Sequence, residues 1–242
     1  MNLSVTSKPP TSFPAHILDI SIGKKVLMAV TGFIAFGYVC GHMLGNLQIF
    51  MGQDQLNTYA ETLHSFGPLL WVIRAFLLLA FVVHVWFGIK LKLEAYGARP
   101  IGYQTKATVK ATLASRTMIW TGLIVLLFFI YHILHYTARV TNPEYNNLVD
   151  SLGRPDVYTM VIKGFSNWFI SGFYMLAVAL LSYHLSHGVA SMFQSLGLNT
   201  QQWQVRLHRI AWFFTVVLFL GYASIPAAVL AGCGLVTAGG GY

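Results

Sequence analysis

Charged residues are scarce in this sequence. Asp, Glu, Lys and Arg make up 9% of its 242 residues, whereas hydrophobic residues make up 56%. A soluble globular domain usually carries about 25% charged residues. The deficit is too large for a water-facing surface of ordinary size, so the composition excludes a soluble protein. The length alone would accommodate two soluble domains, but the long apolar runs leave no room for one, and we expect a single membrane domain.

Cysteine is also rare, and the motifs of several functional classes are missing. Cys40 and Cys233 lie far apart in apolar stretches without a Cys-x-x-Cys pair, which excludes a disulfide framework and a redox dithiol. The sequence contains no His-Glu-x-x-His, no Gly-rich phosphate loop and no Rossmann fingerprint. The N-terminal region has no apolar core of about 7–15 residues, so we expect no signal peptide.

Apolar sequence is abundant and occurs in long runs. A helix needs about 20 mostly apolar residues to cross a bilayer. Five segments meet this requirement: Val26–Phe50, Pro68–Ile89, Met118–Tyr136, Trp168–Val189 and Ile210–Val236. Barrel strands are excluded because no segments of about 10 residues alternate in hydrophobicity. Since a chain in lipid must satisfy its own backbone, we predict an all-α integral membrane bundle of five transmembrane helices.

The basic residues fall on one side of this predicted bundle. Eleven of the 15 share the side of the N-terminus: Lys8, Lys24, Lys25, Lys90, Lys92, Arg99, Lys106, Lys110, Arg116, Arg206 and Arg209. The other four are Arg74, Arg139, Arg154 and Lys163. The positive-inside rule therefore predicts a cytoplasmic N-terminus and an outer C-terminus. The chain then divides into a cytoplasmic tail (1–25), a five-helix domain (26–236) and an outer tail (237–242).

The net charge of +8 is concentrated in these loops. A strongly basic chain can indicate a nucleic-acid partner. Because the charges cluster between apolar segments, we expect contact with membrane lipid and no nucleic-acid partner.

Histidine occurs inside four of the five predicted spans. Ionisable residues within a membrane are costly and are read as functional. At a rise of about 1.5 Å per residue, His42 and His132 lie in the outer halves of the first and third spans. His84 and His184 lie nearer the cytoplasm in the second and fourth spans. The four histidines therefore sort into an outer pair and an inner pair.

Two histidines at one height on facing helices suit the axial ligation of a haem iron. A single intramembrane histidine can simply hydrogen-bond across a bundle, but four at two levels favour iron ligation in two haems b. Three glycines follow these histidines on the same helical faces, where they leave room for a porphyrin edge or for another helix: Gly45, Gly88 and Gly188. Zinc is a weaker interpretation, because closed tetrahedral spacing is missing. His135 and His187 lie a turn nearer water and are expected to contact haem propionates or water.

Several stretches resemble one known family. They are Gly23-Lys24-Lys25 with Thr31-Gly32, His42-Met43-Leu44-Gly45-Asn46, Leu56-Asn57-Thr58-Tyr59-Ala60 with Leu63-His64, Thr121-Gly122 ahead of His132, and Gly172-Phe173-Tyr174 with Tyr183-His184-Leu185-Ser186-His187-Gly188. Together they resemble the dihaem cytochrome b membrane anchor, of the single-polypeptide five-helix type, of succinate dehydrogenases and fumarate reductases (complex II). The resemblance spans roughly residues 24–198; beyond it only the presence of a fifth helix matches.

The resemblance implies specific haem ligands, partner subunits and a cellular location. His42 and His132 would ligate a distal haem, and His84 and His184 a proximal one. The partners would be a flavoprotein subunit that oxidises succinate and an iron–sulfur subunit that passes electrons to this anchor, which reduces a membrane quinone, menaquinone. The location would be a bacterial inner (plasma) membrane, crossed several times. This chain would hold no succinate site. The physiological direction and the assembly of complexes into homotrimers stay open.

Two further sets of residues are candidates for contacts with these groups. Near the proximal haem the basic propionate candidates are Lys24, Lys25, Lys90 and Arg116. Quinone reduction needs a polar group at the bilayer edge to supply protons. On the outer side the candidates are Glu61, His64, Asn57 and Arg74, which we prefer; on the inner side they are Ser21, Lys24 and His208.

Two other functions compete with this interpretation. The first is the cytochrome b anchor of another quinone-linked enzyme, such as a hydrogenase or formate dehydrogenase, which would share the haems but not the partners. The second is a haem-free transporter with a histidine proton relay, which interrupted helices at mid-membrane would favour. Only Pro226 falls deep inside a predicted span.

Overall fold

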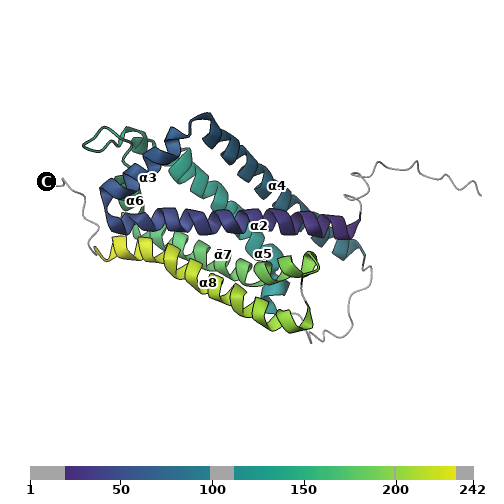
Figure 1. Ribbon diagram of the computed structural model, residues 1–242. Helices are drawn as coiled ribbons and strands as arrows, with labels where there is room; N and C mark the ends of the chain where they lie inside the picture. Colours follow the sequence, from purple (N-terminus) through teal and green to yellow (C-terminus); the bar gives the residue numbers. More distant parts are fainter. Residues whose placement is uncertain (1–19, 99–111, 199, 233–242) are drawn as a thin grey trace, which may run out of the picture.

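The computed structural model describes residues 20–98, 112–198 and 200–232, and these are almost entirely helical (Figure 1). Within these ranges there is no strand, only an isolated bridge between Val149 and Pro155. The predicted all-α class is therefore confirmed.

Five long helices run roughly along one axis of the molecule (Figure 1). They are α2 (Ser21–Asn46), α4 (Pro68–Gly97), α5 (Leu113–His132), α7 (Trp168–Ser195) and α8 (Gln201–Leu230). A 3-10 turn, η1 (Leu47–Met51), extends α2, and a π-helical turn, η2 (Ile133–Thr137), extends α5. All five are long and apolar enough to cross a membrane. The prediction of five spans is confirmed in these terms.

The helix boundaries differ from the predicted ones mainly at the polar ends. Helix α2 begins at Ser21, inside the predicted tail, because Lys24 lies within the helix and pairs with Glu94 of α4. Helices α4 and α7 continue several residues past their apolar runs, since a helix does not have to end at the membrane surface. The rest of the predicted N-terminal tail, the predicted end of the last span at Val236, the outer tail and Cys233 lie outside the described residues.

Contacts between helices close a ring. Helix α2 packs against α4, α4 against α5, α5 against α7, and α7 against α2. Helix α8 lies outside this ring and packs along α7 and against α2. The four ring helices are the four that carry the histidines singled out above.

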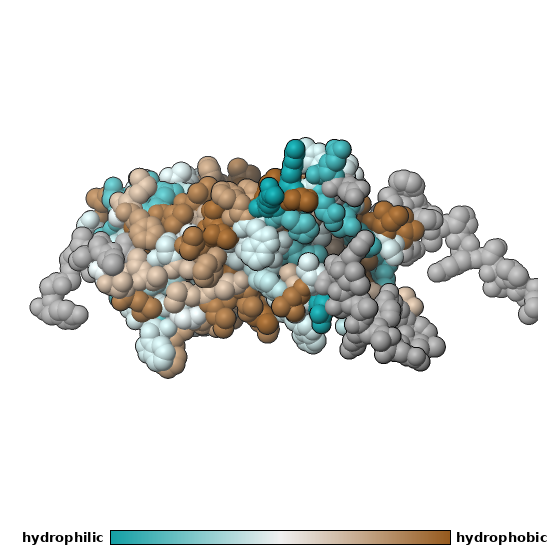
Figure 2. Space-filling model, turned by 90° about the horizontal axis from the view of Figure 1, so that it is seen from below, coloured by the Kyte–Doolittle hydropathy of each residue, from teal (hydrophilic) through white to brown (hydrophobic). Residues whose placement is uncertain are grey.

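The two ends of the bundle differ in character. One end, here called the basic end, holds the starts of α2, α5 and α8 and the ends of α4 and α7, with Lys25, Arg116 and Arg209 exposed. Lys8, Arg99, Lys106 and Lys110 lie outside the described residues. On the face seen in the space-filling view, hydrophilic side chains gather toward this end and apolar side chains cover most of the rest (Figure 2). A broad apolar surface of this kind is what a membrane-embedded bundle requires.

The other end, here called the capped end, is closed by short helices. They are α3 (Gln53–Ser65), η3 (Pro143–Asn147) and α6 (Val157–Ser166). Asn57 of α3 is fully buried at this end. Its amide nitrogen donates to Asp150 and Asp156, both at 3.1 Å, and its oxygen accepts from the backbone N–H of Tyr158 at 3.0 Å.

Acidic residues of the cap are held in their charged form. Burial would raise the pKa of Asp150, but hydrogen bonds from the Arg154 backbone N–H, from Asn57 and from the Arg154 side chain lower that pKa to about 2. The pKa of Asp156 is also lowered, because hydrogen bonds from Thr159, Asn57 and Gln53 outweigh the effect of burial. The cap is thus fastened by charge-assisted hydrogen bonds, which are stronger than neutral ones.

Candidate functional site

The four intramembrane histidines meet in two pairs inside the helix ring. At the capped-end level, the rings of His42 (α2) and His132 (α5) lie 5.8 Å apart between centroids, with 77° between their planes. At the basic-end level, His84 of α4 contacts α2 through the Met28 carbonyl, and His184 of α7 contacts α5 through the Thr121 hydroxyl. The structure therefore brings His42 and His132 together and places His84 and His184 within the same ring of helices. That these histidines bind a metal stays a prediction.

Hydrogen bonds fix the tautomer of the basic-end pair. Nδ1 of His84 lies 3.1 Å from the backbone carbonyl of Met28. A carbonyl oxygen can only accept, so Nδ1 of His84 carries the proton. The Nε2 atom then has a free lone pair, and no partner for it occurs among the described residues. A neutral imidazole with a bare Nε2 is the form that binds a metal.

His184 reaches the same state through a hydroxyl. Its Nδ1 lies 3.2 Å from Oγ1 of Thr121 on α5. That hydroxyl already donates to the Met118 carbonyl at 3.0 Å, so its oxygen accepts the proton of His184 Nδ1. Metal-bound histidines almost always donate their second nitrogen to such an acceptor. Both basic-end histidines are thus oriented before any ligand binds.

Two glycines on neighbouring helices make room for these imidazoles. A Cβ atom at Gly32 of α2 would lie 3.1 Å from Cε1 of His84, and a Cβ at Gly122 of α5 would lie 3.2 Å from Cε1 of His184. Contacts this short are tighter than nearly all real Cβ contacts, so the ring would have to shift by a few tenths of an ångström. Glycines on facing helices therefore give space to the imidazoles. Of the three glycines predicted to leave room beside the histidines, Gly45 is filled by the ring of Tyr59, Gly188 meets only Met118 at 3.5 Å, and Gly88 faces open space.

The capped-end pair is set in an aromatic environment. Tyr38 stacks on His42 at 5.4 Å with nearly parallel rings, and Tyr222 of α8 lies 6.2 Å away. The amide nitrogen of Asn46 donates to Nε2 of His42 at 3.2 Å. To bind a metal through Nε2, His42 would have to give up this hydrogen bond with Asn46. On the other side, Nδ1 of His132 lies 3.5 Å from the hydroxyl of Tyr174.

The separation of the capped-end imidazoles is compatible with both binding one transition metal. An imidazole nitrogen binds such a metal at about 2 Å, and each ring centre lies about 1 Å behind its nitrogen, so two such imidazoles have centroids at most about 6 Å apart. The observed separation is 5.8 Å. Among the described residues no group of three His, Cys, Asp or Glu side chains gathers.

The propionate candidates lie in contrasting places. Lys24 is 4% exposed and paired with Glu94, so its charge is already partnered. Lys25 and Arg116 are exposed and Lys90 is half-buried, all at the basic end. His187 is half-buried one turn beyond His184. His135 is fully buried within the π-helical turn, with its Nδ1 3.0 Å from the Tyr174 hydroxyl.

The preferred quinone residues do not form one group. Both amide hydrogens of Asn57 are used within the cap, so we leave this residue out of the candidate site. Glu61 is exposed on α3, and His64 is exposed with its Nδ1 donating to its own helix at Ala60. Arg74 lies over the ring of Trp71 at 4.9 Å.

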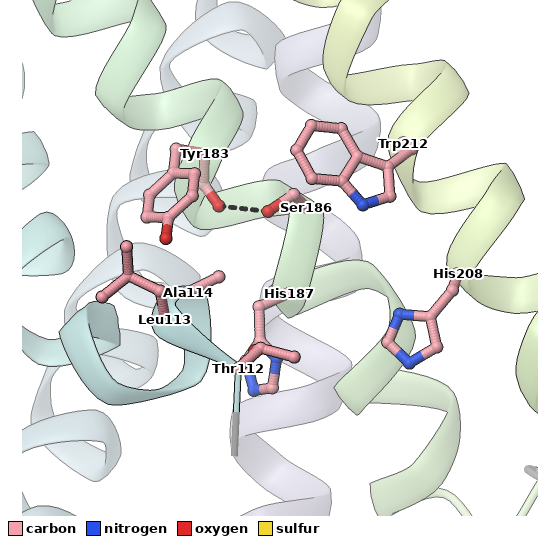
Figure 3. A pocket seen from close by; sticks show the side chains of 8 residues that line it. All are labelled: Thr112, Leu113, Ala114, Tyr183, Ser186, His187, His208 and Trp212. Atoms are coloured by element: carbon pink, nitrogen blue, oxygen red, sulfur yellow. Dashed lines mark hydrogen bonds between the residues drawn. The ribbon is translucent and has the colours of Figure 1, made fainter. Parts of the chain in front are cut away.

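A cavity of about 220 Å³ opens at the basic end, between the start of α5, the end of α7 and the first half of α8. His187 and His208 face it together with Tyr183 and Trp212 (Figure 3). The Ser186 hydroxyl donates to the Tyr183 carbonyl at its edge. Of the inner-side quinone candidates, His208 lines this cavity, whereas Ser21 is exposed at the start of α2 and Lys24 is paired.

Sequence reasoning did not identify the groups that hold the histidines. Thr121, Gly32 and Gly122 were noted only as parts of family-like stretches, and Tyr174 likewise. The sequence did contain one usable signal for these residues. A hydroxyl residue or a glycine occurs on a neighbouring helix at the same predicted height as a histidine. Comparison with known proteins adds nothing here, because no family model, no curated protein and no solved structure matches the chain.

Proposed function

We propose that this chain is a dihaem cytochrome b subunit that anchors a succinate:quinone oxidoreductase in the membrane and passes electrons to quinone. In this proposal the basic end is cytoplasmic, the capped end lies outside, and the membrane is a bacterial inner membrane. One haem b would lie at each histidine level. The partners are a flavoprotein and an iron–sulfur subunit.

One observation carries the haem part of the proposal. Four helices of a closed ring each direct one histidine inward, at two levels, and at the basic-end level the other ring nitrogen is already hydrogen-bonded. Structural histidines that merely satisfy each other would use both nitrogens. Here Nε2 of His84 and of His184 has no partner among the described residues, so the basic-end pair is free to bind a metal, whereas Nε2 of His42 at the other level accepts a hydrogen bond from Asn46.

The chain's own residues would orient the cofactors and exclude water. Bound haem supplies one-electron chemistry at each level. Met28 and Thr121 fix the two basic-end imidazoles, and Gly32 and Gly122 give those rings space. The cap formed by α3 and α6 closes the capped end of the bundle. Neutral imidazoles, without competing carboxylates, fit the low charge of the interior.

The test is the haem content of each single-histidine variant. We expect two haems b per purified chain by pyridine haemochrome, and one after His42→Ala or His84→Ala, with different spectral components lost. His64→Ala is the matched control, because His64 is exposed and bonded only to its own helix. It should retain both haems. A haem-free protein, purified from intact membranes with its partners, would refute the proposal.

The choice of partner rests on the family resemblance and on charge. The exposed basic side chains at the basic end suit an acidic docking face of an iron–sulfur subunit, although part of this charge is the topology signal itself. Co-purification of a flavoprotein identifies complex II. Co-purification of a hydrogenase or formate dehydrogenase subunit would instead identify another cytochrome b anchor. The transporter alternative predicted an interrupted helix at mid-membrane, but α8 is continuous through Pro226.

The quinone site has two candidate locations. Glu61, His64 and Arg74 at the capped end would make electrons cross most of the bilayer, which costs or yields about 2.3 kcal/mol per charge at 100 mV. The basic-end cavity, with His187, His208 and Trp212, offers donors for quinone carbonyls and a flat ring beside them. Lost quinone turnover in Glu61→Gln places the site at the capped end. Normal turnover there, with loss in His208→Ala, places it in the cavity.

A further inference from the structure

A third histidine lies behind the capped-end pair. His135 is 0% exposed, and its Nε2 is buried with no hydrogen-bond partner among the described residues. It sits in the π-helical turn that follows His132 directly. Such turns occur frequently at functional sites. A buried polar atom without a partner is unfavourable, so this placement needs an explanation that packing does not supply.

One hydroxyl connects this histidine to the candidate ligand. The Tyr174 oxygen lies 3.0 Å from Nδ1 of His135 and 3.5 Å from Nδ1 of His132. Tyr174 is 5% exposed. Its ring is held by edge-on contacts with Phe128 at 5.1 Å and Phe165 at 5.1 Å. The hydroxyl is therefore fixed between the two imidazoles.

The single hydroxyl proton determines the direction of the chain. A histidine that binds metal through Nε2 keeps its proton on Nδ1. His132 then donates to the Tyr174 oxygen, and the Tyr174 hydroxyl donates to Nδ1 of His135. In the opposite direction Tyr174 would donate to His132, whose proton would sit on Nε2 and prevent metal binding. Only the first arrangement is compatible with ligation.

This arrangement differs from the basic-end pair. Met28 offers a backbone carbonyl, and the Thr121 hydroxyl gives its proton to a carbonyl of its own helix. At the capped end, the acceptor passes its proton to another imidazole. Hydrogen bonds in such a chain polarise one another, so the Tyr174 oxygen is a stronger acceptor for the His132 proton than it would be without His135 behind it.

We propose that Tyr174 is a positioning residue for His132, and that with His135 behind it the hydroxyl fixes the ligand's tautomer and raises its basicity. The inference rests on the proposed haem function. A more basic axial histidine stabilises the oxidised iron. The capped-end haem is therefore tuned to a lower midpoint potential than it would have without this hydroxyl.

The test is an optical redox titration of the haem-loaded chain in its assembled complex. Tyr174→Phe keeps the ring and removes the oxygen; we expect a higher midpoint potential and an altered electron paramagnetic resonance signal for one haem only. Thr121→Val, the matched change at the other level, should shift the other haem. Tyr131→Phe removes a hydroxyl from the same aromatic cluster that makes no hydrogen bond to His132 in the structure, and should shift neither.

An unchanged potential and spectrum in Tyr174→Phe would overturn the inference while leaving the haem proposal intact. A chain without haem in its unaltered form would instead remove the proposed function. If Tyr174→Phe loses the capped-end haem, His135→Phe is titrated instead, because it keeps Tyr174 and removes only the last group of the hydrogen-bond chain. A rise in the midpoint potential of the capped-end haem in His135→Phe supports the inference, and an unchanged potential overturns it.

Discussion

The basic-end site has almost no free space behind its imidazoles, which gives a sharp prediction. A Cβ at Gly32 would lie 3.1 Å from Cε1 and 3.2 Å from Nδ1 of His84. Ordinary contacts are a few tenths of an ångström longer, so Gly32→Ala must push the ring toward the centre of the bundle and away from the Met28 carbonyl. Overpacking of this size typically costs about 1–3 kcal/mol.

The cost should appear in haem affinity. Since about 1.4 kcal/mol corresponds to a tenfold change in a dissociation constant, Gly32→Ala should weaken one of the two haems by about 5- to 150-fold. The assay is transfer of haem to an excess of a haem-scavenging protein, followed separately for each spectral component. Gly37→Ala is the control, because a Cβ there meets nothing within 4 Å. Equal retention of both haems in the two variants would refute the argument that His84 is a ligand held against Gly32.

Three further predictions concern the ends of the bundle. Asn57→Leu removes three hydrogen bonds and should destabilise the cap by about 3 kcal/mol, at about 1 kcal/mol for each bond. Gln55→Leu, which removes only an exposed hydrogen bond with Gln48, should not destabilise it. Thermal unfolding in detergent compares the two variants. The Asp150 carboxylate stabilises the folded cap fully above its ordinary pKa, and this stabilisation is lost as pH falls from about 4 through about 2. Protease accessibility of the cap should rise in that window, and Asp150→Asn should weaken the dependence and leave the part that comes from Asp156, whose pKa is also lowered. Glu94→Gln should lower stability by about 1–3 kcal/mol, because it leaves buried Lys24 without its partner; a double variant that also carries Lys24→Met should recover most of the loss.

The spans and the two histidine levels followed from the sequence for simple reasons. A helix that crosses lipid is recognised by an apolar run alone, without knowledge of its neighbours. Height along a straight helix is proportional to residue number, and alternate spans run in opposite directions. These two rules were sufficient to pair His42 with His132, whose ring centroids lie 5.8 Å apart, and to predict His84 and His184 as the second pair.

The surroundings of the histidines depend on contacts that a single sequence does not reveal. The Met28 carbonyl that orients His84 lies 56 residues away along the chain. Of the glycines predicted to leave room on the histidine's own helix, Gly88 faces open space but Gly45 is filled by Tyr59, and the glycines that give space to the imidazoles are Gly32 and Gly122 on facing helices. Which residues face each other depends on how two helices cross and rotate, and apolar composition does not fix that rotation.

Asn57 shows a second way in which the fold adds to the sequence. This residue was a quinone candidate because quinone reduction needs a polar group at the bilayer edge to supply protons. The cap uses it instead to join α3 to residues 93–101 positions further along the chain. A buried asparagine that hydrogen-bonds to two carboxylates and a backbone N–H stabilises the cap, and these contacts are visible only in the fold.

The fifth long helix explains why the ring can hold its geometry. Helix α8 supplies no candidate ligand, yet it packs along α7 and against α2, which carry one histidine of each pair. Its Gly221 receives the side chain of Met43, the neighbour of His42, so closely that a Cβ would overlap Sδ. The Tyr222 hydroxyl donates to the Val39 carbonyl of α2 at 2.7 Å. These contacts fix the rotation of α2 about its axis at the level of His42. A histidine that is to bind a metal must be held in direction as well as in height, so these contacts of α8 would keep His42 aligned with His132 for the proposed ligation.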